Sequence, residues 1–146
     1  MLEIENQAIS VIAGDTTIDG YLNPSVDDNR IYAWYPPTDI EYNETNKSAI
    51  VYFNNMPKRS FNWSYPSQMP DIFFYFRVLS LSQLEVRQIS ERLIDLFDNT
   101  SIQTTNWSVK WISVHGYADG ESEGSPTKLI LVKNVSFNFT NVFRRG

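Results

Sequence analysis

The strongest constraint on the fold is a strand that leads directly into a capped helix. Residues 71–80 form a near-continuous apolar run, which predicts a central strand covered on both faces. Ser82 and Glu85 have the spacing of a capping box, and Leu81 with Val86 fits a hydrophobic staple. The helix that follows should bury a single apolar stripe, which consists of Val86, Ile89, Leu93, Leu96 and Phe97.

The remaining pattern predicts one more helix and four more strands. Apolar residues recur at helical spacing over 2–13, and Gly14 is expected to end that helix in a left-handed conformation. Further strands are expected over 30–35, 48–54, 107–115 and 128–143, with turn-rich connections at 15–29 and 116–127. This order predicts an α+β fold, with a mostly antiparallel sheet of about five strands and two helices packed on one face.

Length and composition set the class of protein. The 146 residues suffice for one domain, expected to span 1–146. The absence of cysteine excludes a disulfide framework and a thiolate zinc site. A net charge of −5 argues against a general binder of nucleic acid or of anionic membranes. The acidic start and the short apolar runs predict neither a secretory signal nor a membrane-spanning segment.

The single histidine lies beside an acidic, glycine-rich stretch. His115 is followed by Asp119, Glu121 and Glu123, an arrangement open to interpretation as a carboxylate–histidine dyad or a weak cation site. We favour an exposed histidine at a strand end, because a glycine-rich turn does not hold ligands rigidly. We therefore predict no catalytic residue, no metal site and no cofactor. An enzyme with paired-carboxylate chemistry is the weakest hypothesis, since no pair is singled out by position.

A long insertion at 55–70 is the main candidate for an interaction site. It combines aromatic and basic side chains: Phe61, Trp63, Tyr65, Lys58 and Arg59. A stacking platform for a sugar or for single-stranded nucleic acid is one interpretation. The favoured interpretation is packing on the chain's own sheet or a contact with a neighbouring subunit, because exposed aromatic patches mark interaction sites. We predict an assembly contact here.

Two further sets of residues invite a functional interpretation. Trp107 and Trp111 share one face of a predicted strand and are expected to lie in the core rather than in a ligand cage. Arg144 and Arg145 form a basic end, interpreted as a solvated tail or as a charged contact with an acidic partner.

The order of elements resembles the tail terminator (tail-completion, head–tail joining) proteins of long-tailed bacteriophages. An N-terminal helix and loop precede a strand at 30–37 that ends in proline, and a second strand follows at 49–53. The aromatic strand then runs into the capped helix over 74–98. A closing strand pair ends in Val-Ser-Phe-Asn-Phe at 135–139.

The resemblance implies a structural protein rather than an enzyme. Such a protein forms a ring, typically hexameric, in the neck of the virion after assembly in the host cytoplasm. Its partners would be further copies of itself, the major tail tube protein and a stopper or connector protein. DNA would pass through the lumen without specific binding, which an acidic chain permits. The alternatives are another ring protein of the neck, or a carbohydrate- or peptide-binding module that uses the 55–70 aromatic residues.

Overall fold

The computed structural model describes residues 2–55, 68–69, 71–125 and 128–145, which form an α+β fold. The helices are α1 (Leu2–Ala13), α2 (Thr16–Leu22) and α3 (Gln83–Phe97). The strands are β1 (Ile31–Ala33), β2 (Ser48–Asn54), β3 (Gln68–Met69), β4 (Ile72–Ser80), β5 (Thr100–Gln103), β6 (Trp107–Asp119), β7 (Glu123–Ser125) and β8 (Lys128–Arg144).

The main path of the sheet runs β1-β2-β4-β8-β6-β5, and the short strands β3 and β7 pair with β8. β1 is parallel to β2, and the other pairings are antiparallel. The predicted α+β class and mostly antiparallel sheet are confirmed. The described residues form six strands in the main path rather than five, and three helices rather than two.

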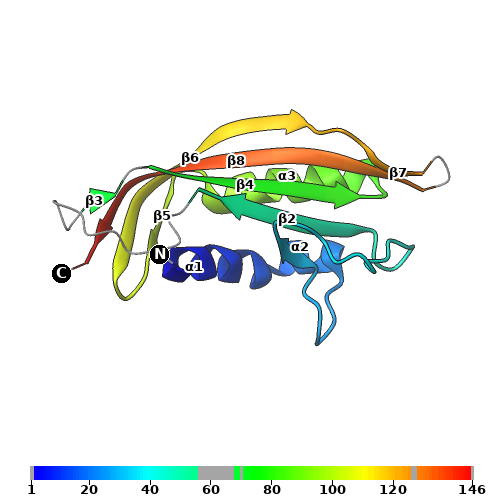
Figure 1. Cartoon of the computed structure of the whole chain (residues 1–146), viewed down its shortest axis with the longest axis horizontal. Coiled ribbons are helices and arrows are strands. Elements are labelled where there is room, and N and C mark those ends of the chain that lie inside the picture. The colour runs from blue at the N-terminus through cyan, green and yellow to red at the C-terminus, as the bar shows by residue number, and fades with distance from the viewer. Residues whose placement is uncertain (1, 56–67, 70, 126–127, 146) are drawn as a thin grey trace.

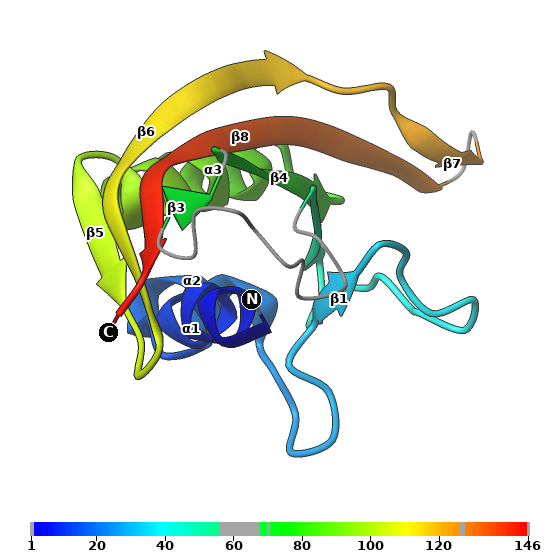
Figure 2. The same ribbon diagram turned by 60° about the vertical axis from the view of Figure 1, so that its left-hand side comes forward.

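The three helices lie on the same side of the curved sheet (Figures 1 and 2). The main core forms between them and the inner face of the sheet, where five phenylalanine side chains are the largest that are fully buried. These rings pack against one another in stacked, tilted and edge-on pairs and belong to Phe74, Phe76, Phe97, Phe137 and Phe139. Part of the aromatic content of the chain therefore serves the core.

The outer face of the sheet is covered only in part, which corrects the expectation for β4. β4 is central, between β2 and β8, but its burial alternates: Phe74 and Phe76 are buried, whereas Phe73 and Tyr75 are half-buried. A small second cluster, which includes Tyr42 from the β1–β2 connection, covers one end of the outer face. The apolar run thus belongs to a strand with one buried face and one face that is covered only in part.

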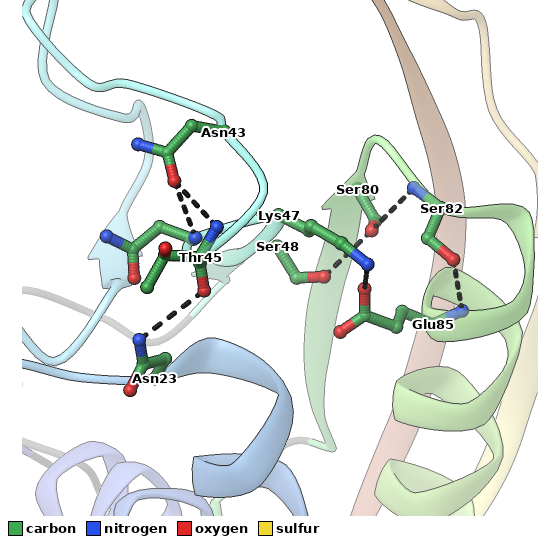
Figure 3. Close-up of polar contacts among 9 residues, drawn as sticks. Asn23, Asn43, Thr45, Lys47, Ser48, Ser80, Ser82 and Glu85 are labelled. Atoms are coloured by element: carbon green, nitrogen blue, oxygen red, sulfur yellow. Dashed lines mark hydrogen bonds and ion pairs between the residues drawn. The ribbon is translucent and has the colours of Figure 1, made fainter.

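The junction between β4 and α3 is held by hydroxyl groups (Figure 3). The Ser82 hydroxyl accepts a bond from the Glu85 backbone N–H at 3.3 Å, which confirms the predicted N-cap. The Ser82 N–H donates instead to the Ser80 hydroxyl at 3.0 Å, and Ser48 donates to Ser80 at 2.8 Å. The Glu85 carboxylate faces the Lys47 ammonium at 3.9 Å. The capping box is therefore only half formed.

We expect Ser82→Ala to lower the free energy of unfolding by about 1 kcal/mol, because the cap on α3 is lost. Urea denaturation measures this change. Ser10→Ala is the matched control, since Ser10 is exposed within α1 and alanine is the better helix former. An equal loss in both variants would contradict the capping role.

The predicted connection at 15–29 contains α2, which the sequence interpretation missed. Asp15 caps this helix by accepting from the Ile18 N–H at 3.0 Å, and Asn23 ends it with a left-handed φ of 50°. Gly14 was expected to adopt the left-handed conformation but does not. Its N–H instead continues the helical bonding of α1. A polar cap, rather than a glycine stop, therefore separates α1 from α2.

Asp15 also joins α2 to α3. Its carboxylate accepts from the Arg92 guanidinium at 2.8 Å (Nη2) and 3.1 Å (Nε). These bonds, helped by the bond from the Ile18 N–H, hold the pKa of Asp15 below its ordinary value despite burial. A carboxyl group with a lowered pKa stabilises the fold above its unfolded pKa of about 3.9. That stabilisation is lost as the pH falls through the folded pKa.

Asp15→Asn should keep a capping oxygen but lose the charge. We expect the variant to be less stable than the wild type at pH 7, and the difference to shrink as the pH falls below about 4. Urea denaturation at several pH values measures this. Asp27→Asn, at an exposed position, is the control and should follow the wild-type curve. A pH-independent difference for Asp15→Asn would contradict the role of the charge.

The β5–β6–β8 end of the sheet departs most from the sequence prediction. β5 was not expected, and β6 and β8 extend past their predicted ends. Val109 and Ile112 are both buried although three residues apart, as are Phe139 and Val142 on the paired strand. Asn141 has a φ of 51° between the latter two, and a left-handed residue shifts the alternation of side chains by one position. The two strands therefore bend together.

Candidate functional site

The predicted assembly contact falls outside the part of the chain that the structure describes. Lys58, Arg59, Phe61, Trp63 and Tyr65 all belong to the segment 56–67. The contact stays a prediction from the sequence.

Arg144 and Arg145 are exposed but are bonded to neighbouring segments, and their predicted contact with an acidic partner stays a prediction from the sequence. Arg144 is the last residue of β8 and pairs with Trp107 on β6. The Arg145 backbone N–H donates to the Asn106 carbonyl at 2.8 Å, and its guanidinium donates to the Thr104 carbonyl at 2.6 Å. Arg145 also lines an open polar groove of about 720 Å³ between α1 and the β5–β6 turn. Arg145 thus holds the β5–β6 turn through these two hydrogen bonds.

His115 lies within a strand rather than at its end, because β6 continues to Asp119. Its exposed ring lies 5.0 Å from the Phe73 ring, centroid to centroid. Asp119 bonds the Lys133 ammonium at 2.8 Å, and this bond raises the pKa of Lys133. No group of three or more potential metal-ligating side chains converges within the described ranges. The structure brings Asp119 to a lysine rather than to His115.

The two tryptophans of β6 have different environments. Trp107 is partly buried against the main core, as predicted for both residues. Trp111 is 53% exposed, and its indole N–H donates to the Asn99 side-chain oxygen at 3.2 Å. The prediction for Trp111 was wrong because the bend opposite Asn141 places Ile112, not Trp111, on the buried face.

Three aromatic rings form a row across the outer face of the sheet. Trp34, Phe53 and Tyr75 come from the end of β1, from β2 and from β4, and we call them the aromatic row. The Trp34 and Phe53 rings stack with centroids 5.7 Å apart, and the Phe53 and Tyr75 rings with centroids 4.9 Å apart. Phe53 and Tyr75 are register partners. Half of the Trp34 side chain remains exposed at the open end.

The backbone conformation of Trp34 ends β1 and places the Trp34 ring in the aromatic row. Its φ is 69°, in the left-handed region that bulky side chains seldom adopt. Its backbone N–H still donates to the Tyr52 carbonyl at 2.8 Å, which keeps the residue beside β2. A residue held in this conformation is a candidate for a functional role, because the fold must compensate for the strain.

The row stops abruptly at Tyr75, where a groove begins. The next positions across the sheet are Ser136 on β8 and Gly116 on β6. These small residues form the floor of a groove of about 400 Å³. Arg77, Asn134 and Ala118 also line it. We call it the Tyr75 groove. A Cβ atom on Gly116 would lie 2.8 Å from the Ser136 hydroxyl, so a larger residue at this position would force the Ser136 side chain to move.

The side chains on this face are of the kinds that stack on planar groups. The Tyr75 ring forms one side of the Tyr75 groove, and Arg77 also lines it. A guanidinium group can stack on aromatic rings. Nearby ionisable side chains are engaged within the fold: the Tyr32 hydroxyl donates to Asp28 at 2.6 Å, and burial together with that bond raises the pKa of Tyr32. The sequence interpretation missed this site because its residues come from separate strands. The only signal was the outward position of Phe53 and Tyr75 in alternating strands.

Comparisons with known proteins give no family for this chain. No protein-family model matches it, and no curated protein sequence matches it either. No helix among the described residues combines the length and the apolar character needed to cross a membrane.

Proposed function

We propose that the chain is a structural subunit of a phage neck: a hexameric ring that caps the tail tube and joins it to the head connector. The observation that carries the proposal is the outer face of the sheet, where an aromatic row with an exposed end is followed by an unfilled groove. A surface of this kind suits a protein contact. The order of elements, which resembles that of the tail terminator proteins, supplies the particular role.

The edges of the sheet also support a ring. A closed ring is built from heterologous contacts, in which one surface of a subunit meets a different surface of the next. Within the described residues, β1 pairs only with β2, and β6 beyond Ile112 pairs only with β8. Open edges at opposite ends of a sheet can each pair with another chain, and the two edges differ from one another. These features favour subunit–subunit contacts.

The partners follow from the proposed position. The ring would contact copies of itself, the tail tube protein below and a stopper or connector protein above, and it would lie in the virion after assembly in the host cytoplasm. The net charge of −5 suits a lumen through which DNA passes without adhering. The proposal assigns no reaction, metal or cofactor to the chain. A different ring of the same neck would use the same surfaces.

Negative-stain electron microscopy tests this function. The purified chain, mixed with isolated tail tubes of the same virus, should appear as rings at tube ends and should block tube extension. An unrelated acidic α+β protein of similar size is the control. A chain that caps no tube and joins no tube to a head would contradict the proposal.

A ligand-binding module is the second candidate, and the Tyr75 groove favours it. Its volume falls within the range of roughly 300–1,000 Å³ typical of small-molecule sites. Stacking on Tyr75 with polar contacts from Arg77 and Asn134 would suit a sugar. Titration calorimetry with oligosaccharides tests this candidate, with Tyr75→Ala as the variant expected to lose binding. Heat changes that persist in Tyr75→Ala would exclude the groove as the sugar site.

A further inference from the structure

We propose that residues 31–47 form a strap that opens as a unit while the rest of the fold stays intact. We call this segment the outer strap, and it comprises β1 and the connection from β1 to β2 (Figure 2). Its opening uncovers the second apolar cluster on the outer face of the sheet and takes Trp34 out of the aromatic row. The inference concerns the chain alone and does not rest on the neck function.

The two ends of the outer strap lie side by side, so the segment can leave the sheet without displacing the strands around it. β1 is parallel to β2, and the connection therefore returns to the end of the sheet where β1 begins. The Ile50 N–H donates to the Arg30 carbonyl at 3.0 Å, and the Arg30 Nε donates to the Ser48 carbonyl at 2.8 Å. Within the described residues, β1 pairs only with β2. Opening therefore requires changes only at the two ends of the strap and the loss of one short strand pairing.

The outer strap buries little apolar surface. Of its residues, all of which the structure describes, only Ile31 and Tyr42 are buried. The other buried members of the second cluster lie on β2, β4 and β8, which stay paired with one another when the strap leaves: Ala49, Val51, Leu79 and Val132. Segments with few buried apolar side chains open at a lower free energy than the whole fold.

Backbone strain at both ends of β1 favours opening. Arg30 and Trp34, which flank β1, have φ values of 59° and 69°, in the left-handed region that residues other than glycine seldom adopt. Trp34 is also the centre of a three-residue turn, in which the Tyr35 N–H donates to the Ala33 carbonyl at 2.8 Å. A γ-turn with a positive φ is the rare and strained form. Such strain persists only where the surrounding contacts hold it, and opening of the strap releases it.

Arg30 is the main side chain that holds the outer strap closed. It is 6% exposed, and its Nη2 donates to the Glu41 carbonyl in the middle of the strap at 3.1 Å. Its guanidinium also lies 5.6 Å from the centre of the Tyr42 ring. Lys47 adds a weaker contact, because its ammonium lies 3.9 Å from the Glu85 carboxylate and is partly exposed. The closed state therefore depends chiefly on one buried guanidinium.

Thiol labelling of the full chain tests the proposal. The sequence contains no cysteine, so an introduced cysteine is the only thiol of each variant. Val51→Cys places a thiol in the second cluster, and Val78→Cys places one in the main core; both positions are 0% exposed. The rate of reaction with a thiol reagent in native conditions is divided by the rate for the same variant unfolded in urea.

We expect the normalised rate of Val51→Cys to exceed that of Val78→Cys by at least about 10-fold. Low concentrations of urea should change the Val51→Cys rate little, because opening of the strap exposes little surface, and should raise the Val78→Cys rate steeply. Equal rates with equal urea dependences would overturn the proposal, because the strap would then open only when the whole chain unfolds.

Two background substitutions separate opening of the strap from unfolding. Phe97→Ala weakens the main core, so it should speed the labelling of Val78→Cys and leave that of Val51→Cys unchanged. Arg30→Met should speed the labelling of Val51→Cys by roughly 100-fold, the factor for loss of the guanidinium hydrogen bonds. Arg30→Lys is the milder change to use if Arg30→Met does not fold, and it should shift the rate in the same direction. Equal acceleration of both probes by Phe97→Ala would contradict a separate opening of the strap.

Amide hydrogen exchange of the unmodified chain gives a readout that no cysteine substitution perturbs. The Ile50 N–H, which bonds the Arg30 carbonyl, should exchange through an opening that is nearly independent of urea. Amides of β4 that are paired with β8 should exchange only through unfolding, with a steep dependence on urea. A steep dependence at Ile50 as well would overturn the proposal.

Discussion

Replacement of Phe97 by alanine is expected to lower the free energy of unfolding by about 3–5 kcal/mol. The Phe97 side chain is 1% exposed, and its ring lies 5.8 Å from that of Phe76 and 5.3 Å from that of Phe137. The loss combines the transfer of a large apolar group with the cavity left between α3 and the sheet. Urea denaturation followed by tryptophan fluorescence or circular dichroism measures it.

Leu84→Ala is the matched control for this core variant. Leu84 lies in the first turn of α3 and is 62% exposed, so its truncation should change the stability by no more than about 0.5 kcal/mol. A loss below about 1 kcal/mol for Phe97→Ala would contradict the packing of α3 against the phenylalanine cluster.

Arg30→Met is expected to lower the free energy of unfolding by about 3 kcal/mol. The loss comes from the hydrogen bonds that the charged guanidinium donates, rather than from a cavity. Arg30 is 6% exposed and its guanidinium lies 5.6 Å from the centre of the Tyr42 ring. Its Nε donates to the Ser48 carbonyl at 2.8 Å and its Nη2 to the Glu41 carbonyl at 3.1 Å. Methionine fills a similar volume but leaves both carbonyl oxygens without this donor.

Two further variants interpret the result for Arg30. Arg30→Lys keeps the charge but offers a single ammonium group, so it should lie between the wild type and Arg30→Met. Arg87→Met is the control, because the Arg87 side chain is 62% exposed and its ion pair with Glu91 at 4.0 Å is worth only about 0.3–0.5 kcal/mol. Equal effects at Arg30 and Arg87 would show that the buried guanidinium does not hold the β1–β2 connection.

The parts of the fold that the sequence predicted are those determined by neighbouring residues. The Ser82 cap and the buried stripe of α3 lie within one helix, so spacing alone identifies them. α2 was missed because its seven residues contain the pair Asp19-Gly20, which is typical of a turn. The helix depends on Asp15, whose carboxylate binds Arg92 from a position 77 residues away. No local pattern carries that information.

The candidate site was less predictable than the fold. Trp34, Phe53 and Tyr75 meet only when three strands adopt a particular register, and the groove depends on Ser136 and Gly116 in two more strands. The sequence interpretation assigned the outward residues of β4 to a second buried face. Exposed aromatic side chains were predicted in the 55–70 insertion, from its composition, rather than on the sheet.

The central position of β8 has a consequence for biosynthesis. β8 is the last of the described strands, yet it separates β4 from β6 and also pairs with β3 and β7. During translation β4 emerges before β8, and the edge of β4 that will pair with β8 is then unpaired. β4 contains the run Ile72–Leu79, which has the composition of aggregation-prone segments. Arg77 is the only charge in this run. The sheet closes only when β8 has emerged from the ribosome, so β4 keeps an edge open to mispairing until then.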